Sequence, residues 1–322
     1  MLVINKAEVI KFLSVKKCIE IMKSALADLA RGEAIQNLRS VIQIENGGIL
    51  GQMPGYLQNK KILGTKVISV FADNHQYKLP SHQGVVLLFD SVNGELKAVV
   101  DGTAITAIRT AAVSAVATDL LAKKEAATLC LLGAGEQARS HLEAILAIRP
   151  IKRVNVWSRH KETAMLFKRE MEEKFSADIQ VCSSAERAAN GAAIICTVTA
   201  SEEPVLKNNW VMDGAHINAV GACRPNSREL DSELVARSEF YVDRSESAQK
   251  ESGDYLIPLQ EGKIKKTHII GEIGEILIGK IKGRESNKSI TVFDSLGLAI
   301  EDLAAAYYIY QQAENRAVEQ KK

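Results

Sequence analysis

Residues 126–138 read AATLCLLGAGEQA, and this stretch decides the fold of the chain. It predicts a buried strand, a tight glycine turn and the start of a helix, which together form the pyrophosphate-binding element of a dinucleotide fold. Gly133 would allow the turn, Gly135 would let the backbone approach the phosphates, and Ala138 would let the helix pack closely on the strand. The free N–H groups of the first helical turn would then face the anion.

Strands and helices alternate after this element, which predicts a parallel sheet with helices on both faces. The expected strands begin at Thr128 and continue at 154–157, 179–181, 193–197, 216–220 and 289–293. The expected helices cover 140–148 and 162–174, with a short one after Ser184. The fold class is therefore α/β, with a Rossmann-type doubly wound dinucleotide domain.

The first third of the chain has a different pattern, typical of an antiparallel sheet with helices. Residues 14–30 have helical apolar spacing with Ser14 as the cap, and 103–121 form an alanine-rich helix. The expected strands are 39–44, 49–54, 62–70, 84–90 and 96–101, with turns at 46–48 and 91–94. We expect a last helix at 298–312 to return to this region, which gives an α+β domain of residues 1–118 and 299–322 beside a dinucleotide domain of 119–298.

Composition excludes several classes of protein. The 322 residues carry a formal net charge of +2, which gives no electrostatic case for a nucleic-acid or membrane partner. Five scattered cysteines fit reduced thiols better than disulfides or a metal site, which favours a cytoplasmic location. We expect neither a signal peptide nor a membrane span.

The nucleotide preference depends on the segment about 20 positions past the glycines, where an acid would bind the ribose 2′-hydroxyl. Trp157, Ser158 and Arg159 occupy this place without a carboxylate. Ser158 and Arg159 would suit a 2′-phosphate, so we predict NADPH as cofactor, with NADH tolerated. The alternative is a solvated basic turn.

Three cations of the first region are candidates for holding an anionic substrate. Arg39, Lys66 and Arg109 fall in strand or helix settings where an unpaired charge would be costly. Converging on one pocket, they would grip a carboxylate. The alternative for each is a side chain that reaches solvent. His82, just before a strand, is a secondary candidate.

Seven separated stretches of the chain occur together in one family. They are 51–54 (GQMP), 64–66 (GTK), 80–83 (PSHQ), 107–112 (AIRTAA), 132–138 (LGAGEQA), 216–221 (HINAVG) and 293–297 (FDSLG). In these blocks the chain resembles the ornithine cyclodeaminase and mu-crystallin family over nearly its whole length. The resemblance implies a homodimer, in which the first domain binds substrate and forms the subunit contact.

The resemblance also implies roles for residues. Lys66 and Arg109 would be catalytic, and Arg39, Met53 and His82 would join them in binding substrate. The cofactor would contact Thr110, Gly133, Gly135, Glu136, Gln137, Trp157, Ser158, Arg159, Thr197, Val198, Gly221, Cys223, Ser295 and Leu296.

The chemistry is indicated by residues 221–225, which read GACRP. Cyclodeaminases of the family carry an aspartate where this chain has Cys223, whereas the form with Arg224 and Pro225 resembles the ketimine reductase branch. We therefore expect NAD(P)H-dependent reduction of cyclic imine 2-carboxylates, most simply 1-pyrroline-2-carboxylate to L-proline, with 1-piperideine-2-carboxylate to L-pipecolate also accepted. The alternatives are ornithine cyclodeaminase or alanine dehydrogenase activity, or a non-catalytic protein that binds NADPH and a hormone.

Overall fold

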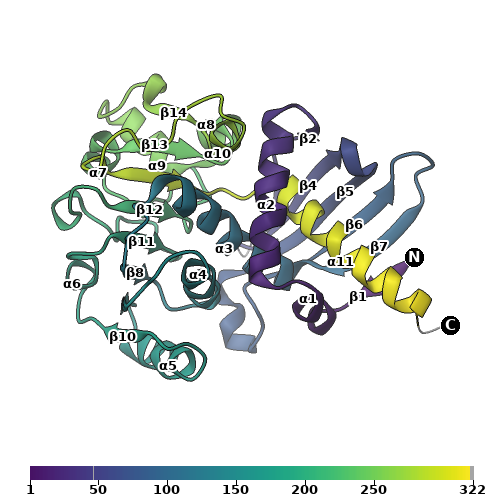
Figure 1. The fold of residues 1–322 in the computed structure, drawn as a ribbon, viewed down its shortest axis with the longest axis horizontal. Coiled ribbons are helices and arrows are strands. Elements are labelled where there is room, and N and C mark those ends of the chain that lie inside the picture. Colours follow the sequence, from purple (N-terminus) through teal and green to yellow (C-terminus); the bar gives the residue numbers. More distant parts are fainter. Residues whose placement is uncertain (46, 320–322) are drawn as a thin grey trace. The chain divides into compact units, whose positions relative to one another are not determined.

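The computed structural model describes residues 1–45 and 47–319, and the chain divides into two compact units (Figure 1). Unit 1 comprises Met1–Arg109 and Gly297–Lys322, and unit 2 comprises Thr110–Leu296. The divisions therefore fall earlier than the expected ones, at 109/110 and 296/297. The first lies inside the continuous helix α3 (Gly102–Leu121), as does the expected division at 118/119.

Unit 2 is built on a parallel sheet, which confirms the predicted doubly wound fold. Its described strands lie in the order β10 (Asp178–Val181), β9 (Arg153–Trp157), β8 (Thr128–Leu132), β11 (Ile194–Thr197), β12 (His216–Ala219), β15 (Thr291–Asp294), β13 (Glu239–Val242) and β14 (Ile269–Glu272). The chain runs from β8 outward to β10 and then returns to β11 on the other side of β8. This reversal between β8 and β11 is the switch point where α/β sheets bind ligands.

Both faces of this sheet are buried, which explains why β8 is continuously apolar from Leu129 to Leu132. Leu129 and Leu131 pack into one core with α4 (Glu136–Leu146) and α5 (Lys161–Glu172). Cys130 and Leu132 point the other way, into a core shared with α6 (Ala185–Ala189) and α7 (Ser232–Arg237). Successive residues of a strand face opposite sides, so a strand covered on both sides reads as a continuous apolar run.

Part of unit 2 was not foreseen. Sequence patterns assigned no element between 221 and 288, where the structure has α7, β13, α8 (Ser245–Glu251), α9 (Gly253–Gln260), β14 and α10 (Ile273–Leu277). These elements are short, so no apolar period repeats often enough within any of them to be recognised.

Unit 1 contains a mostly antiparallel sheet. Its described strands lie in the order β1 (Leu2–Ile4), β7 (Leu96–Asp101), β6 (His82–Asp90), β5 (Ile62–Val70), β4 (Ile49–Leu57) and β2 (Ala34–Gln36), and β3 (Ser40–Gln43) also pairs with β4. No element had been assigned to residues 2–4, where β1 pairs in parallel with β7. Residue 46 of the expected turn at 46–48 lies outside the described residues.

Strand β4 continues to Leu57, although the expected strand stopped at Pro54. On the side away from β5, β3 pairs with β4 only as far as Gln52, and β2 pairs with it from Gly55. Pro54 falls between these two partners, where the N–H that proline lacks is not needed for a ladder.

Helices cover one face of this sheet. Helix α1 (Lys6–Phe12) leads into α2 (Val15–Ala30), whose expected cap is confirmed by the Ser14 side chain accepting from the Lys17 amide at 3.3 Å. Helix α11 (Ala299–Glu319) packs against α2 and against β4, β5 and β6 (Figure 1). The last helix of the chain thus lies in the core of unit 1.

One described helix, α3, is long and apolar enough to span a membrane by length and composition. Most of it is buried within the protein. That is typical of a core helix.

Candidate functional site

A buried charge cluster lies in unit 1, between strand β5 and helix α11. The Lys66 side chain is 2% exposed, and its Nζ donates to Asp302 Oδ1 at 3.2 Å and to Oδ2 at 3.3 Å. Arg109, on α3, donates from Nε to Asp302 Oδ1 at 3.0 Å and from Nη1 to Glu301 Oε2 at 2.6 Å. Asp302 therefore joins two of the three predicted cations.

Two facing glycines bring α11 close enough to make these contacts. Gly55 on β4 pairs with Gly64 on β5. A Cβ at Gly55 would lie 3.0 Å from Leu303 Cδ1, and one at Gly64 would lie 2.7 Å from Leu303 Cδ2. Leu303 of α11 therefore packs on strand backbone that carries no side chain. Leu303 is next to Asp302 in the sequence, and Gly64 is two residues from Lys66.

The carboxylates occupy the first turn of α11, where the helix dipole favours negative charge. Glu301 Oε2 also accepts from the Leu298 amide at 3.1 Å, and Gln36 Oε1 accepts from the Ile300 amide at 3.2 Å. These bonds satisfy amides that a helix start leaves without partners. Glu301 therefore helps to fix both the start of the helix and the Arg109 side chain.

Gly297 brings Arg39 to the same place. Arg39 Nη2 donates to the Gly297 carbonyl at 3.5 Å. Gly297 has φ +80, and a Cβ there would lie 2.7 Å from Arg109 Nη1. The three predicted cations, Arg39, Lys66 and Arg109, thus surround the start of α11.

The cluster retains one positive charge, since it combines three cations with Glu301 and Asp302. Burial, as the largest cause, lowers the pKa of Lys66 from 10.5 to about 8, and the charge of Asp302 opposes this shift. Lys66 is therefore charged at neutral pH but close to titration. Such a site can bind a monocarboxylate and tolerate a cationic group near it.

Sequence reasoning missed Glu301 and Asp302. They are fully buried, and Asp302 lies 193 residues from Arg109 along the chain. A signal was present, because two adjacent acids interrupt an otherwise apolar run at 296–310. Acids at a helix start are also common on the surface, and only the packing of α11 distinguishes these two.

Two other predicted residues have different positions. Met53 pairs with Lys66 across β4 and β5 and is buried beside it. His82 is exposed, pairs with Val70 and has its Nδ1 3.0 Å from Ser81 Oγ. Val70 lies four residues along β5 from Lys66, roughly 13 Å of strand. The described contacts therefore do not bring His82 into the cluster.

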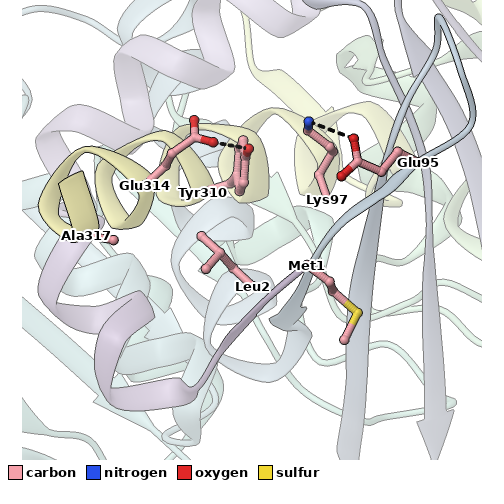
Figure 2. A pocket seen from close by; sticks show the side chains of 7 residues that line it. All are labelled: Met1, Leu2, Glu95, Lys97, Tyr310, Glu314 and Ala317. Atoms are coloured by element: carbon pink, nitrogen blue, oxygen red, sulfur yellow. Dashed lines mark hydrogen bonds and ion pairs between the residues drawn. The ribbon is translucent and has the colours of Figure 1, made fainter. Parts of the chain in front are cut away.

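A surface hollow of about 270 Å³ lies elsewhere in unit 1, between the N-terminus, β7 and α11. Figure 2 shows its lining residues, Met1, Leu2, Glu95, Lys97, Tyr310, Glu314 and Ala317. Its polar groups are engaged with one another: Lys97 donates to Glu95 at 3.2 Å, and the Tyr310 hydroxyl donates to Glu314. None of the sequence-predicted residues lines it, so we do not regard it as the functional site.

In unit 2, most predicted cofactor residues gather at one edge of the sheet, because the carboxyl ends of parallel strands lie side by side. Gly133, Gly135, Glu136 and Gln137 follow β8; Trp157, Ser158 and Arg159 end or follow β9; Thr197 and Val198 end or follow β11; Gly221 and Cys223 follow β12; Ser295 and Leu296 follow β15. Thr110 lies apart in the sequence, on α3.

The glycine turn has the geometry that a dinucleotide requires. Gly133 has φ +112, and a Cβ on it would lie 2.6 Å from the Val198 carbonyl. Gly135 caps α4 without a side-chain hydrogen bond, and a Cβ there would meet open space. The first-turn amides of α4 can thus face an anion beside the switch point. These residues fit the pyrophosphate of a nicotinamide dinucleotide.

Other atoms at this edge also suit a ligand. Ser295 Oγ and Gln137 Oε1 are buried without a hydrogen-bond partner in the described part of the chain. Cys223 Sγ lies 3.9 Å from the Ser295 carbonyl, which links the loops after β12 and β15. Arg159 is exposed and Ser158 half-buried beyond β9. The five cysteines, all within the described residues, form no disulfide.

The glycine turn at a switch point, together with a separate unit holding a buried charge cluster, defines a two-unit dinucleotide-binding protein. The profile of the ornithine cyclodeaminase/mu-crystallin family matches residues 1–317. The chain belongs to this family, which confirms the resemblance found in the sequence.

Relatives within the family include enzymes of imine and amino-acid chemistry. The chain is 44% identical to the ketimine reductase mu-crystallin of Mus musculus over 297 residues, 90% of each chain. The structure of the Δ1-pyrroline-2-carboxylate reductase of Thermococcus litoralis, in complex with NADH and L-proline, matches with a TM-score of 0.96 and 39% identity, over 98% of each chain. An archaeal alanine dehydrogenase dimer with bound NAD matches with a TM-score of 0.93 and 31% identity, over 98% of this chain and 97% of that one.

Proposed function

We propose that this protein is an NAD(P)H-dependent reductase of cyclic imine 2-carboxylates, with 1-pyrroline-2-carboxylate reduced to L-proline and 1-piperideine-2-carboxylate to L-pipecolate. The observation that carries the proposal is the buried cluster of Lys66, Arg109 and Asp302, which retains one positive charge with Arg39 and Glu301 counted. The carboxylate of such a substrate is complementary to that positive charge. The relatives that reduce such imines support the assignment.

The roles of the residues follow from their positions. Arg39, Lys66 and Arg109 would bind and orient the substrate carboxylate, with arginine able to hold it by two parallel bonds. Asp302 would keep Lys66 and Arg109 in place. The carboxyl-edge loops of unit 2 would hold the cofactor, whose reduced nicotinamide supplies the hydride. The proton that the imine nitrogen needs would come from solvent or from the Lys66 ammonium, whose pKa of about 8 permits either state.

We infer that NADPH is preferred and NADH tolerated. Arg159 and Ser158 follow β9 where a 2′-phosphate would lie, and this segment carries no carboxylate. The solved relatives bind NADH or NAD, which supports the common nucleotide site.

We also infer a homodimer formed through unit 1. Ile35, Leu50 and Leu63 are exposed on the face of the β2–β4–β5 sheet opposite α11, next to exposed Ile42, which pairs with Leu50 from β3. An exposed apolar surface of this kind marks a contact site, and the archaeal alanine dehydrogenase is a dimer. Sedimentation equilibrium tests this, and a monomer at micromolar concentration would contradict it.

We infer a cytoplasmic location, since five cysteines scattered along the sequence fit reduced thiols better than disulfides.

The decisive experiment follows oxidation of NADPH and NADH with each of the two imine acids, with pyruvate plus ammonia, and with ornithine plus NAD in a separate control. We expect the imine acids to give the highest kcat/KM. Faster ammonia-dependent oxidation would favour an alanine dehydrogenase, and turnover of ornithine would favour a cyclodeaminase. Cofactor binding without any turnover would favour a binding protein.

A further inference from the structure

A second group of buried acids lies in unit 2, behind the loops that carry the predicted cofactor residues. Glu229 and Asp254 are fully buried, and Asp243 is 1% exposed. Glu229 lies just before α7, Asp254 is in the first turn of α9, and Asp243 directly follows β13. The mechanism proposed above uses none of them, and the sequence motifs did not single them out as site residues.

The Glu229 carboxylate joins two loops of the carboxyl edge. Its Oε1 accepts from the Thr199 amide and from the Thr199 hydroxyl, both at 2.6 Å, and its Oε2 accepts from the Gly221 amide at 2.7 Å. Thr199 follows β11 and Gly221 follows β12. One side chain thus fixes the spacing between the loops that contain Thr197, Val198, Gly221 and Cys223.

Gly221 shows how tight this junction is. A Cβ at this position would lie 2.1 Å from the Thr199 carbonyl and 2.7 Å from Glu229 Cδ. A side chain cannot fit between the two loops and the carboxylate. Gly221 was assigned above to the cofactor site. The contact with Glu229 also requires glycine at this position.

Two neighbouring acids, Asp254 and Asp243, also accept hydrogen bonds from backbone amides. Asp254 Oδ1 accepts from the amides of Glu229 at 2.9 Å and Leu230 at 2.8 Å. Asp243 Oδ2 accepts from the Leu296 amide at 2.7 Å, which fixes the loop after β15. Burial, as the largest cause, raises the pKa of Asp254 to about 8 and also raises the pKa of Glu229. The bonds themselves remain important because a buried amide without an acceptor is costly. The three loops that meet at this edge are therefore anchored by acidic side chains.

We infer that Glu229 is a positioning residue, which sets the loops after β11 and β12 in the conformation that binds the nicotinamide end of the cofactor. The inference rests on the proposed cofactor site. An apolar side chain at 229 would leave two backbone amides and a hydroxyl without their acceptor. In the native chain these loops are set before the cofactor arrives, so binding does not have to order them.

The test is Glu229→Gln, with dissociation constants for NADH and NADPH measured by fluorescence without substrate. The amide nitrogen of glutamine would face either Gly221 N–H or the Thr199 donors, so one loop loses its anchor. We expect both dissociation constants to rise about tenfold or more, and KM for NADPH to rise while KM for the imine acid stays near the wild-type value. Glu233→Gln is the matched control, because Glu233 is exposed on α7 and pairs with exposed Lys263.

A second pair of variants keeps the test valid if Glu229→Gln does not fold. Thr199→Val removes one donor to Glu229, and Thr199→Ser retains it. We expect weaker cofactor binding in the valine variant and recovery in the serine variant. Wild-type affinity in both Glu229→Gln and Thr199→Val, or an equal rise of KM for the imine acid, would overturn the inference. If the wild type binds NADPH but reduces no imine acid, the proposed function fails while this inference stands.

Discussion

Both units bury acids, but the partners of those acids differ. In unit 1, Asp302 and Glu301 contact Lys66 and Arg109, so the carboxylates set the charge of the site. In unit 2, Glu229 and Asp254 accept from backbone amides, so the carboxylates set the shape of the site. The difference teaches that the substrate side should respond to removal of a charge, and the cofactor side to changes of hydrogen-bond geometry.

The largest effect should come from removing a cation in unit 1. Arg109→Ala removes one of the three cations proposed to hold the substrate carboxylate, and it leaves the buried Glu301 and Asp302 with one cation fewer. We expect kcat/KM for the imine acid to fall about 10³-fold, while NADPH affinity changes less than about twofold. Arg153→Ala, at an exposed arginine, is the control. Wild-type kcat/KM in Arg109→Ala would refute the carboxylate clamp.

A smaller effect should follow from pH. Lys66 must be protonated to attract a carboxylate, and burial lowers its pKa to about 8. The inhibition constant of pyrrole-2-carboxylate, whose ring nitrogen does not titrate in this range, should be constant near neutrality. Above pH 8 it should rise about tenfold for each pH unit, because one proton is lost.

The Asp302→Asn variant tests whether the charge of Asp302 controls the pKa of Lys66. The negative charge of Asp302 raises the pKa of Lys66, so its removal should shift the rise of the inhibition constant to lower pH. Lys66→Arg should abolish the rise, since arginine stays charged. The proposed role of Lys66 is wrong if the wild-type constant does not change up to pH 9.

The smallest effect should come from Arg159 in unit 2, which we propose to contact the 2′-phosphate of NADPH. Arg159 is exposed, and an exposed ion pair contributes little. In Arg159→Gln, the dissociation constant of NADPH should rise about threefold to fivefold, with that of NADH unchanged. Titration of each cofactor by fluorescence measures both, and equal losses for the two would argue against a 2′-phosphate contact.

Sequence patterns predicted the parts of this fold in which a pattern repeats. The alternation of 128–220 predicted the parallel sheet, and the limits of β5 and β7 were predicted as observed. β1, β13 and β14 have only three or four residues, and they lie outside the alternation of 128–220 that identified the equally short β11 and β12. The turn at Gly133 was recognisable because the backbone conformation itself requires glycine.

For the site, the cations could be recognised one by one, but their partners could not. Lys66 and Arg109 were conspicuous because they interrupt apolar segments. Asp302 and Glu229 depend on contacts between segments far apart in the chain, which no local pattern contains. Placing an acid beside its cation requires the packing of α11, and that packing is a tertiary property.

The facing glycines Gly55 and Gly64 set how closely α11, and with it Asp302, can approach Lys66. One added methyl group on either strand would push against Leu303, and Asp302 is the next residue on the same rigid helix. The ionic balance around Lys66 is thus governed by two positions that carry no charge, no polarity and no side chain at all.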